Sequence, residues 1–137
     1  MPATRYATCG VSSPRERFVR LHHLALRCAD LDRSVAFYSG LLGLELLKRH
    51  FTDEGQLRSV WLRAGDAIVM LERRLAGTGP EEGSGHLVAF AVEDLADWQA
   101  RLTEAEVPID ARSQWSLYFR DPDGHRVAVT TYQAPLP

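Results

Sequence analysis

The stretch SLYFRDPDGHRVAVT, residues 116–130, has the pattern of two short strands joined by a tight turn. Pro122 fixes the backbone φ angle at the first corner of the turn, and Gly124 can adopt the positive φ that such turns need. Apolar residues alternate with polar or small residues on both sides of the turn, which predicts a hairpin with one face toward a core. The core-facing positions are Leu117, Phe119, Val127 and Val129, and the mixed face carries Ser116, Tyr118, Arg120, Arg126, Ala128 and Thr130.

The same order of expected elements occurs twice along the chain. The stretch ALRCADL at 25–31 corresponds to AFAVEDL at 89–95, and in each stretch the aspartate is suited to cap a helix. Each copy predicts a strand, a helix and three further strands, so the duplication indicates two similar modules. The first copy predicts strands at 19–28, 44–51, 57–63 and 67–72 with a helix over 30–42, and the second predicts strands at 87–92 and 107–110, the hairpin at 116–130, and a helix over 94–105.

The sequence therefore predicts an α+β fold in which paired βαβββ modules form an open cup-shaped sheet. The two modules, at about 18–74 and 85–133, form a single domain over 18–137, and the polar residues 1–17 predict a flexible N-terminal extension. Each helix covers one face of its half-sheet, so the two remaining faces would enclose a cup. Such a cup is the default position for a ligand.

The composition excludes several classes of partner. The chain has 137 residues and a formal net charge of −2, whereas nucleic acids and anionic membranes are bound by basic surfaces. The sequence contains no run of 18 apolar residues that would predict a membrane span. Residues 1–17 lack the apolar segment of a secretory signal, so a cytoplasmic location is expected. The two cysteines, Cys9 and Cys28, indicate neither a disulfide nor a zinc site.

The motifs taken together resemble those of the vicinal oxygen chelate superfamily, which includes glyoxalase I, bleomycin-resistance proteins, fosfomycin-resistance proteins and extradiol dioxygenases. The resemblance covers about residues 19–132 and implies a glyoxalase-like fold, a small-molecule ligand in the cup and a homodimer. The matching segments are HLAL at 23–26, DL at 30–31 with Ser34 and FY at 37–38, LGL at 42–44, EDL at 93–95, and the DPDG turn at 121–124.

The same resemblance implies one divalent metal, Fe, Mn, Ni or Zn, held by His and Glu side chains from four strands. The corresponding positions in this chain are His23, Met70, Ala128 and either His86 or Leu87. Alanine cannot bind a metal, and the soft thioether of methionine poorly suits the harder metals. The site is therefore expected to be degenerate, with no tightly bound metal cofactor.

One of these four positions lies on the strand that begins near His86, and it depends on the register of that strand. When the two copies are matched through their Asp-Leu pairs, His86 corresponds to His22 and the ligand position falls on Leu87. A shift of one residue turns a side chain to the other face of a sheet, so only a β-bulge near residues 87–88 would bring His86 into the cup.

The predicted ligand-binding residues lie on the strand faces that would line the cup. They are His23, Arg27, Met70, Glu72, Leu87, Tyr118, Arg120 and Ala128. A phenol and a guanidinium at positions 118 and 120 can fix an aromatic or anionic ligand. Alternatively, Arg120 forms an ion pair that supports the turn. Trp61 and Trp115 are expected to pack or to line a pocket, and His125 is expected to be an exposed turn residue.

Three functions from different classes fit this pattern. The favoured one, because both carboxylate positions are lost, is a binding protein that holds a small organic molecule in the cup, as bleomycin-resistance proteins do. The second is a metal-dependent lyase, isomerase or dioxygenase that uses His23, Glu72 and His86 as ligands. The third is a homodimeric scaffold without a small-molecule function, since open half-sheets leave edges that need covering.

Overall fold

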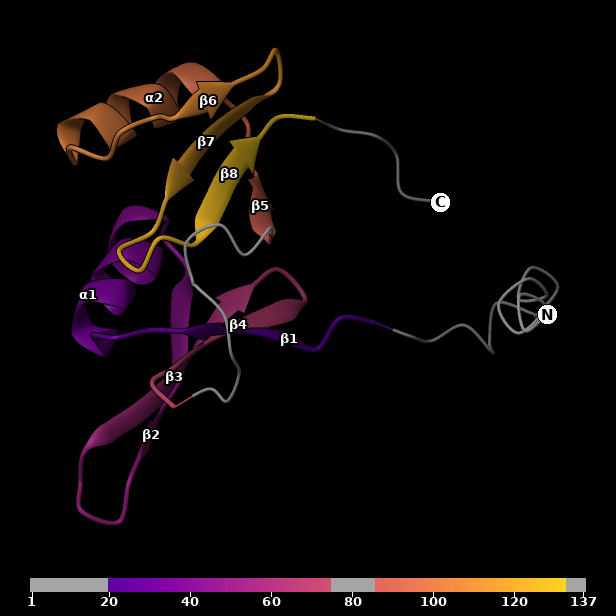
Figure 1. Cartoon of the computed structure of the whole chain (residues 1–137). Coiled ribbons are helices and arrows are strands. Elements are labelled where there is room, and N and C mark those ends of the chain that lie inside the picture. Colours follow the sequence, from indigo (N-terminus) through magenta and orange to yellow (C-terminus); the bar gives the residue numbers. More distant parts are fainter. Residues whose placement is uncertain (1–19, 75–85, 133–137) are drawn as a thin grey trace, which may run out of the picture.

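The computed structural model describes residues 20–74 and 86–132, which form two four-stranded mixed sheets (Figure 1). The strand order is β1-β4-β3-β2 in the first sheet and β5-β8-β7-β6 in the second. The strands are β1 (His23–Arg27), β2 (Glu45–Phe51), β3 (Leu57–Ala64), β4 (Ala67–Glu72), β5 (Leu87–Ala91), β6 (Ala111–Arg112), β7 (Ser116–Arg120) and β8 (Arg126–Thr130). The α+β class and the two βαβββ modules that the sequence predicts are confirmed.

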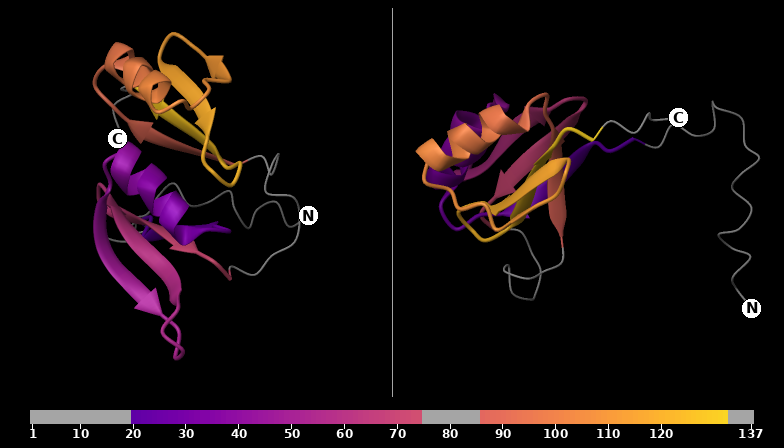
Figure 2. Two further views of the ribbon diagram at one scale, coloured as in Figure 1. Left: turned by 90° about the vertical axis from the view of Figure 1, so that its left-hand side faces the viewer. Right: turned by 90° about the horizontal axis from the view of Figure 1, so that it is seen from above.

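The two modules repeat the same pairing scheme. β1 pairs with β4 in parallel, and β5 pairs with β8 in parallel, whereas the other pairs in both sheets are antiparallel. Parallel neighbours need a crossover connection, and a helix follows the first strand of each module. Figure 2 shows that the two helices lie on the same side of the molecule, each against its own sheet.

The first helix differs from the continuous α-helix that the sequence predicts over 30–42. The side chain of Asp30 caps α1 (Leu31–Val35) by accepting a hydrogen bond from the backbone N–H of Arg33 at 3.2 Å. The next residues, Ala36–Leu41, form a π-helical segment. Two consecutive aromatic residues of this segment, Phe37 and Tyr38, lie in the core.

The second helix and the strand after it also differ in their bounds from the prediction. Asp94 caps α2 (Leu95–Glu104), as expected, through a 2.9 Å hydrogen bond from the N–H of Ala96. The strand predicted over 107–110 is wrong, because the short strand β6 begins only at Ala111. Pro108 lacks a backbone N–H, and the first backbone bond to β7 comes from Asp110, which donates to the carbonyl of Tyr118 at 2.9 Å. The first strand is likewise shorter than the predicted 19–28.

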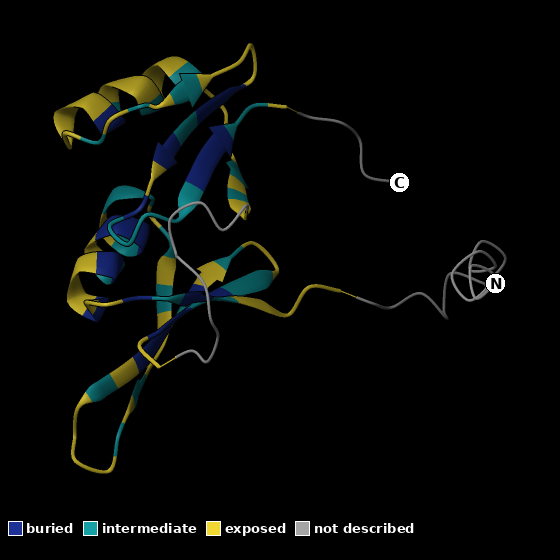
Figure 3. Cartoon of the chain, viewed as in Figure 1, coloured by how far each residue is buried: buried dark blue, intermediate teal, exposed yellow. Residues whose placement is uncertain are grey.

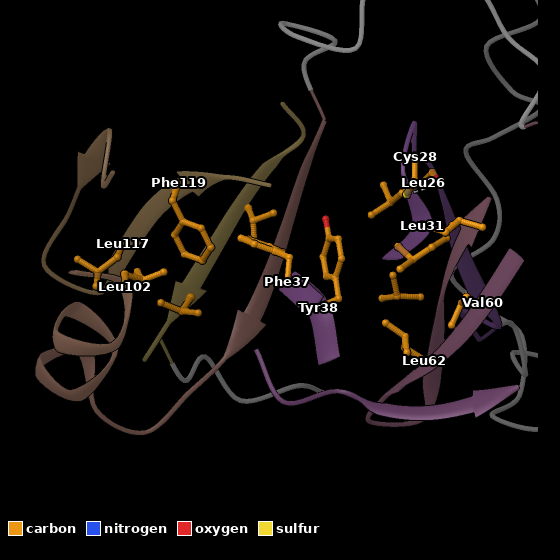
Figure 4. Close-up of a cluster of buried hydrophobic side chains, with 14 residues drawn as sticks. Leu26, Cys28, Leu31, Phe37, Tyr38, Val60, Leu62, Leu102, Leu117 and Phe119 are labelled. Atoms are coloured by element: carbon orange, nitrogen blue, oxygen red, sulfur yellow. Dashed lines mark hydrogen bonds between the residues drawn. The ribbon is translucent and has the colours of Figure 1, made fainter. Parts of the chain in front are cut away.

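A single hydrophobic cluster spans both modules (Figures 3 and 4). In Figure 4, Phe37 and Tyr38 lie between the leucines of the first module and the Phe119 side of the second. The rings of Phe37 and Phe119 have centroids 6.1 Å apart, and Phe119 is fully buried. The π-helical segment thus supplies the aromatic side chains that join the two half-cores.

The turn between β7 and β8 forms a second, polar connection between the modules. The carboxylate of Asp123 accepts hydrogen bonds from the N–H of Ala29 at 2.9 Å and from the hydroxyl of Ser34 at 3.1 Å. The imidazole Nε2 of His125 lies 2.7 Å from the carbonyl oxygen of Arg27. The expectation that His125 is an exposed turn residue is therefore wrong, because the residue is half-buried against the first module.

Within the two described ranges, 20–74 and 86–132, none of the helices combines the length and the apolar character that crossing a membrane requires. The predicted extension at residues 1–17 lies outside these ranges, as do residues 75–85.

Candidate functional site

Each sheet has one face that packs against its helix and one that does not, and we call the second the free face. Leu26, Val60 and Leu71 are buried toward the helix of the first module, so the residues that alternate with them belong to the free face. The free face of the first sheet carries His23, Ala25, Arg27, Ser59, Trp61, Arg63, Ile68, Met70 and Glu72. The free face of the second sheet carries Leu87, Ala89, Ala91, Ser116, Tyr118, Arg120, Arg126, Ala128 and Thr130.

All eight predicted ligand-binding residues lie on these free faces, four on each sheet. In the first sheet, Met70 lies between Ala25 and Trp61 on the neighbouring strands, and Glu72 lies between Arg27 and Ser59. The other four, which belong to the second sheet, are Leu87, Tyr118, Arg120 and Ala128. The strand pairing thus agrees with the period-2 pattern, and ligand binding by these residues stays a prediction.

The start of β1 carries a cluster of aromatic rings. His23 is exposed, its ring stacks on Trp61 with centroids 6.3 Å apart, and its Nδ1 lies 2.9 Å from Nδ1 of His22. His50, on β2, approaches the same indole from another direction at 5.2 Å. The sequence placed His23 on this face, whereas the central position of Trp61 became visible only through the pairing of β3 with β2 and β4.

Glu72 is buried at the far end of β4 and is already engaged. Its Oε1 accepts a hydrogen bond from the backbone N–H of Arg74 at 3.3 Å and lies 3.7 Å from Nε of Arg58. His23 pairs with Ile68, four residues before Glu72, which corresponds to about 13 Å along the strand. Side chains stand roughly perpendicular to a sheet, so those of His23 and Glu72 do not converge on one ion.

The structure also resolves which residue of the pair His86 and Leu87 belongs to the free face. The pairs between β5 and β8 run consecutively from Leu87 to Ala91, without a bulge. Leu87 shares the free face with Ala89 and is 46% exposed, whereas His86 precedes the strand and is exposed. The β-bulge that would bring His86 into the cup is therefore absent from β5.

The second free face combines small side chains with one aromatic side chain. Across the sheet, Ala89, Ala128, Tyr118 and Ala111 are neighbours on successive strands. Ala128 is buried, with 1% of its surface exposed, and Ala89 is exposed. The neighbours of Tyr118 on both adjacent strands are therefore alanines. Beside it, the hydroxyl of Ser116 donates a 2.8 Å hydrogen bond to that of Thr130.

Arg126 is a free-face residue that the sequence did not single out. Its guanidinium carbon lies 4.8 Å above the centroid of the Tyr118 ring, which is a cation–π contact. Asp110 is the acidic neighbour of both Arg126, at 4.0 Å, and Arg120, at 3.5 Å. Arg120 also donates to the carbonyl of Gly124 at 3.0 Å, so it supports the turn as one of the two readings predicted. The alternation of Arg126 with Val127 placed it on the mixed face of the hairpin, but nothing in the sequence indicated its contact with Tyr118.

A separate apolar cavity of about 500 Å³ lies at the junction of the two modules. It is lined by apolar residues from both modules, including Leu24, Leu44, Val69, Phe90 and Trp98. None of the eight predicted ligand-binding residues lines it. This junction cavity is distinct from the polar and aromatic groups of the two free faces, although the free-face residues Ile68, Ala89 and Ala91 also border it.

Burial also sets the protonation of the groups behind the first sheet. Tyr38 donates its phenolic hydrogen to Oδ2 of Asp121 at 2.7 Å. Desolvation raises the pKa of Tyr38, and the nearby Asp121 charge raises it further. Desolvation likewise raises the pKa of the Cys28 thiol, to about 12. Both groups therefore stay protonated near neutral pH and serve the core rather than chemistry.

The four residues at the metal-ligand positions do not fit the divalent metal that the resemblance implies. His23 is the one imidazole among them, while Met70 offers a thioether and Leu87 and Ala128 offer no donor atom. Within the part of the chain that the structure describes, no three His, Cys, Asp or Glu residues form a group suited to a metal ion.

Comparisons with known proteins agree with the fold of two paired modules. The family described as the glyoxalase/bleomycin resistance protein/dioxygenase superfamily matches residues 20–129. The glutathione transferase FosA of Serratia marcescens is 37% identical over 114 residues, which cover 78% of this chain and 77% of that protein. The lactoylglutathione lyase of Salmonella typhimurium is 28% identical over 122 residues, covering 80% of this chain and 90% of the lyase.

Among solved structures, TnmS3, an antibiotic binding protein from Streptomyces sp. CB03234, has a TM-score of 0.67 at 19% identity, covering 83% of this chain and 96% of TnmS3. The three similar proteins are thus named as a transferase, a lyase and a binding protein. Their likeness establishes a shared fold and leaves the reaction, if any, to be argued from the site.

Proposed function

Because the chain belongs to the glyoxalase/bleomycin resistance protein/dioxygenase superfamily, we propose that it binds a small organic molecule on the free faces of its sheets without a tightly bound divalent metal. The observation that carries the proposal is the identity of the residues at positions 70, 87 and 128, where Met70, Leu87 and Ala128 replace metal ligands. A cation held by His23 alone would remain largely water-bound and would be lost easily.

Aromatic and small side chains remain at the places where ligands would be expected. The indole of Trp61 lies beside Met70 on the first free face, and the phenol of Tyr118 lies beside Ala128 on the second. Such groups supply flat apolar surfaces with a few polar atoms, which is the usual composition of small-molecule sites. The loss of the metal ligands and the retention of these surfaces together favour a binding protein over a metal enzyme.

The metal enzyme that would use His23, Glu72 and His86 has less support. Glu72 is engaged by Arg58, the strand register separates it from His23, and His86 lies before β5. Two of these observations concern Glu72 and the third concerns His86, so neither residue is placed to complete a site with His23.

Elemental analysis of protein purified without chelators tests the proposal. We expect well below one Fe, Mn, Ni or Zn per chain, and unchanged content in His23→Ala. A content near one ion per chain that is lost in His23→Ala would contradict the proposal.

A gain-of-function variant provides the matched control. Leu87 and Ala128 are diagonal neighbours on one face of β5 and β8, so Leu87→His with Ala128→Glu places two ligands within reach of one ion. We expect this double variant to bind Ni²⁺ or Zn²⁺ more tightly than the parent, as measured by calorimetry. The variant Leu87→His with Ala128→Gln, which lacks the carboxylate, should show a smaller gain. Tight metal binding of equal affinity in the parent and the double variant would mean that the parent already holds a metal site and would contradict the proposal.

A further inference from the structure

We propose that the ligand is an aromatic carboxylate, or a similar aromatic anion, whose negative group pairs with Arg126. This inference rests on the proposed function and names the class of molecule that the second free face would take. It is carried by the charges, the unpaired nitrogens and the alanines that neighbour Tyr118.

The charge of the free faces is opposite in sign to that of the whole chain. With β2 included, these faces carry four arginines and Lys48 against two carboxylates, Glu45 and Glu72, whereas the chain as a whole has a formal charge of −2. Around Tyr118 two guanidinium groups, those of Arg120 and Arg126, share the single carboxylate of Asp110. An anion would balance this local excess, while a cation would face repulsion.

Some buried side-chain nitrogens on the free faces have no hydrogen-bond acceptor. In the described residues, the buried side-chain nitrogens without a hydrogen-bond partner are Nε of Arg126, Nε1 of Trp61 and Nε2 of His50. The first two can only donate, and both residues lie on free faces. Buried donors normally have partners, so these positions favour a ligand that brings oxygen acceptors.

The surroundings of Arg126 also suit a flat ring. Arg126 already stacks on Tyr118, at 4.8 Å, and across the sheet from that ring lie the buried Ala128 and, one strand further, the exposed Ala89. An aromatic ring can lie over such small side chains and contact the phenol at its edge or face. A carboxylate on that ring would then reach the guanidinium with charge-assisted hydrogen bonds.

The experiment compares two probes of nearly identical shape, 2-naphthoate and 2-naphthamide, by titration calorimetry. We expect 2-naphthoate to bind at least about tenfold more tightly than the neutral amide, since one good charge-assisted contact contributes about that factor. In Arg126→Met, which keeps an unbranched flexible side chain but removes the guanidinium and its charge, the affinities for the two probes should become equal. The matched control is Arg63→Met on the first sheet, whose guanidinium is paired with Glu45 at 3.0 Å, and it should keep the preference.

Two further variants locate the bound ring. Tyr118→Leu should weaken the binding of both probes, whereas Ala64→Leu, which narrows the junction cavity, should leave binding unchanged. Weaker binding in Ala64→Leu, together with unchanged binding in Tyr118→Leu, would place the ring in the junction cavity and overturn the inference. Near-ultraviolet circular dichroism of each variant checks that its core packing is intact.

The outcomes separate this inference from the proposed function. Equal affinity of the parent for the two probes, or a preference that survives in Arg126→Met, overturns the anionic class while small-molecule binding stands. Binding of neither probe overturns the aromatic class, and the proposed function is then decided by the metal analysis and by thermal shifts with a panel of non-aromatic molecules.

Discussion

The phenolic hydroxyl of Tyr38 donates a 2.7 Å hydrogen bond to Oδ2 of Asp121, and this buried contact joins the helix of the first module to the β7–β8 turn of the second. The other carboxylate oxygen of Asp121 accepts bonds from the N–H groups of Asp123 and His125, both at 2.9 Å. One side chain therefore shapes the turn and attaches it to the neighbouring module. The DPDG motif has a tertiary role in this chain besides its turn geometry.

Replacing Tyr38 by phenylalanine tests this connection. Tyr38→Phe leaves a buried carboxylate oxygen of Asp121 without its donor, so we expect the free energy of unfolding to fall by about 1–3 kcal/mol. The measurement is urea denaturation followed by circular dichroism. The matched control is Tyr132→Phe, because Tyr132 is 58% exposed and its hydroxyl is not needed by the core. Equal stability of the two variants would show that the contact contributes nothing.

Much of the fold could be predicted because its signals are local. Alternating residues define the faces of β7 and β8, Asp30 and Asp94 mark the helix starts, and the positive φ of 83° at Gly43 follows from its place after the helix. The duplication then fixes how the elements group. Each of these signals is written within a few residues of the element that it describes.

Other features could not be predicted because they depend on tertiary partners. The π-helical turn buries Phe37 beside Phe119, a residue 82 positions later, and nothing near Phe37 in the sequence indicates that partner. The free faces were assigned correctly by alternation, but the stacking of Arg126 on Tyr118 depends on which of several cations reaches the ring. Strand register, and not composition, determined the position of His86.

Two glycines near the end of the first helix allow a matched test of backbone conformation. A Cβ atom added at Gly40 or at Gly43 would meet no atom within 4 Å, so the two sites differ chiefly in backbone conformation. Gly40 lies within the helical segment, and Gly40→Ala should raise the free energy of unfolding by about 0.5–1 kcal/mol. Gly43 has a φ of +83°, and Gly43→Ala should lower the free energy of unfolding by about 1 kcal/mol. Thermal and urea unfolding measure both effects, and the same sign in both variants would contradict the conformational argument.

A homodimer is predicted from the edges of the two sheets. β1 and β5 each pair on one side only, and three exposed leucines, Leu21, Leu24 and Leu87, lie on or beside these edge strands. Covering unpaired edges and exposed apolar side chains favours association. Light scattering at micromolar concentration should return twice the mass of one chain, and Leu24→Lys should lower that mass. The control is Leu47→Lys on β2, and a parent of monomeric mass would contradict the prediction.

The thiol of Cys28 should be unreactive in the native protein. Burial raises its pKa from 9.0 to about 12, so its thiolate fraction at about pH 8 is about a thousandfold below that of an ordinary cysteine. In a Cys9→Ser background, Ellman's reagent should label Cys28 only in denaturant. Rapid labelling of the native protein would contradict the buried position of this residue.

The same shift predicts how stability depends on alkaline pH. The folded protein holds the Cys28 proton more tightly than the unfolded chain does, so this group's contribution to stability is complete below about pH 9 and is lost as the pH rises toward 12. Tyr38 also has a raised pKa, so the contribution of Cys28 is measured by comparing two proteins that differ only at position 28. We expect the stability of Cys9→Ser to fall more steeply above pH 9 than that of Cys9→Ser with Cys28→Ala, as followed by urea denaturation. Parallel pH profiles in the two proteins would mean that Cys28 ionises equally easily in the folded and unfolded states.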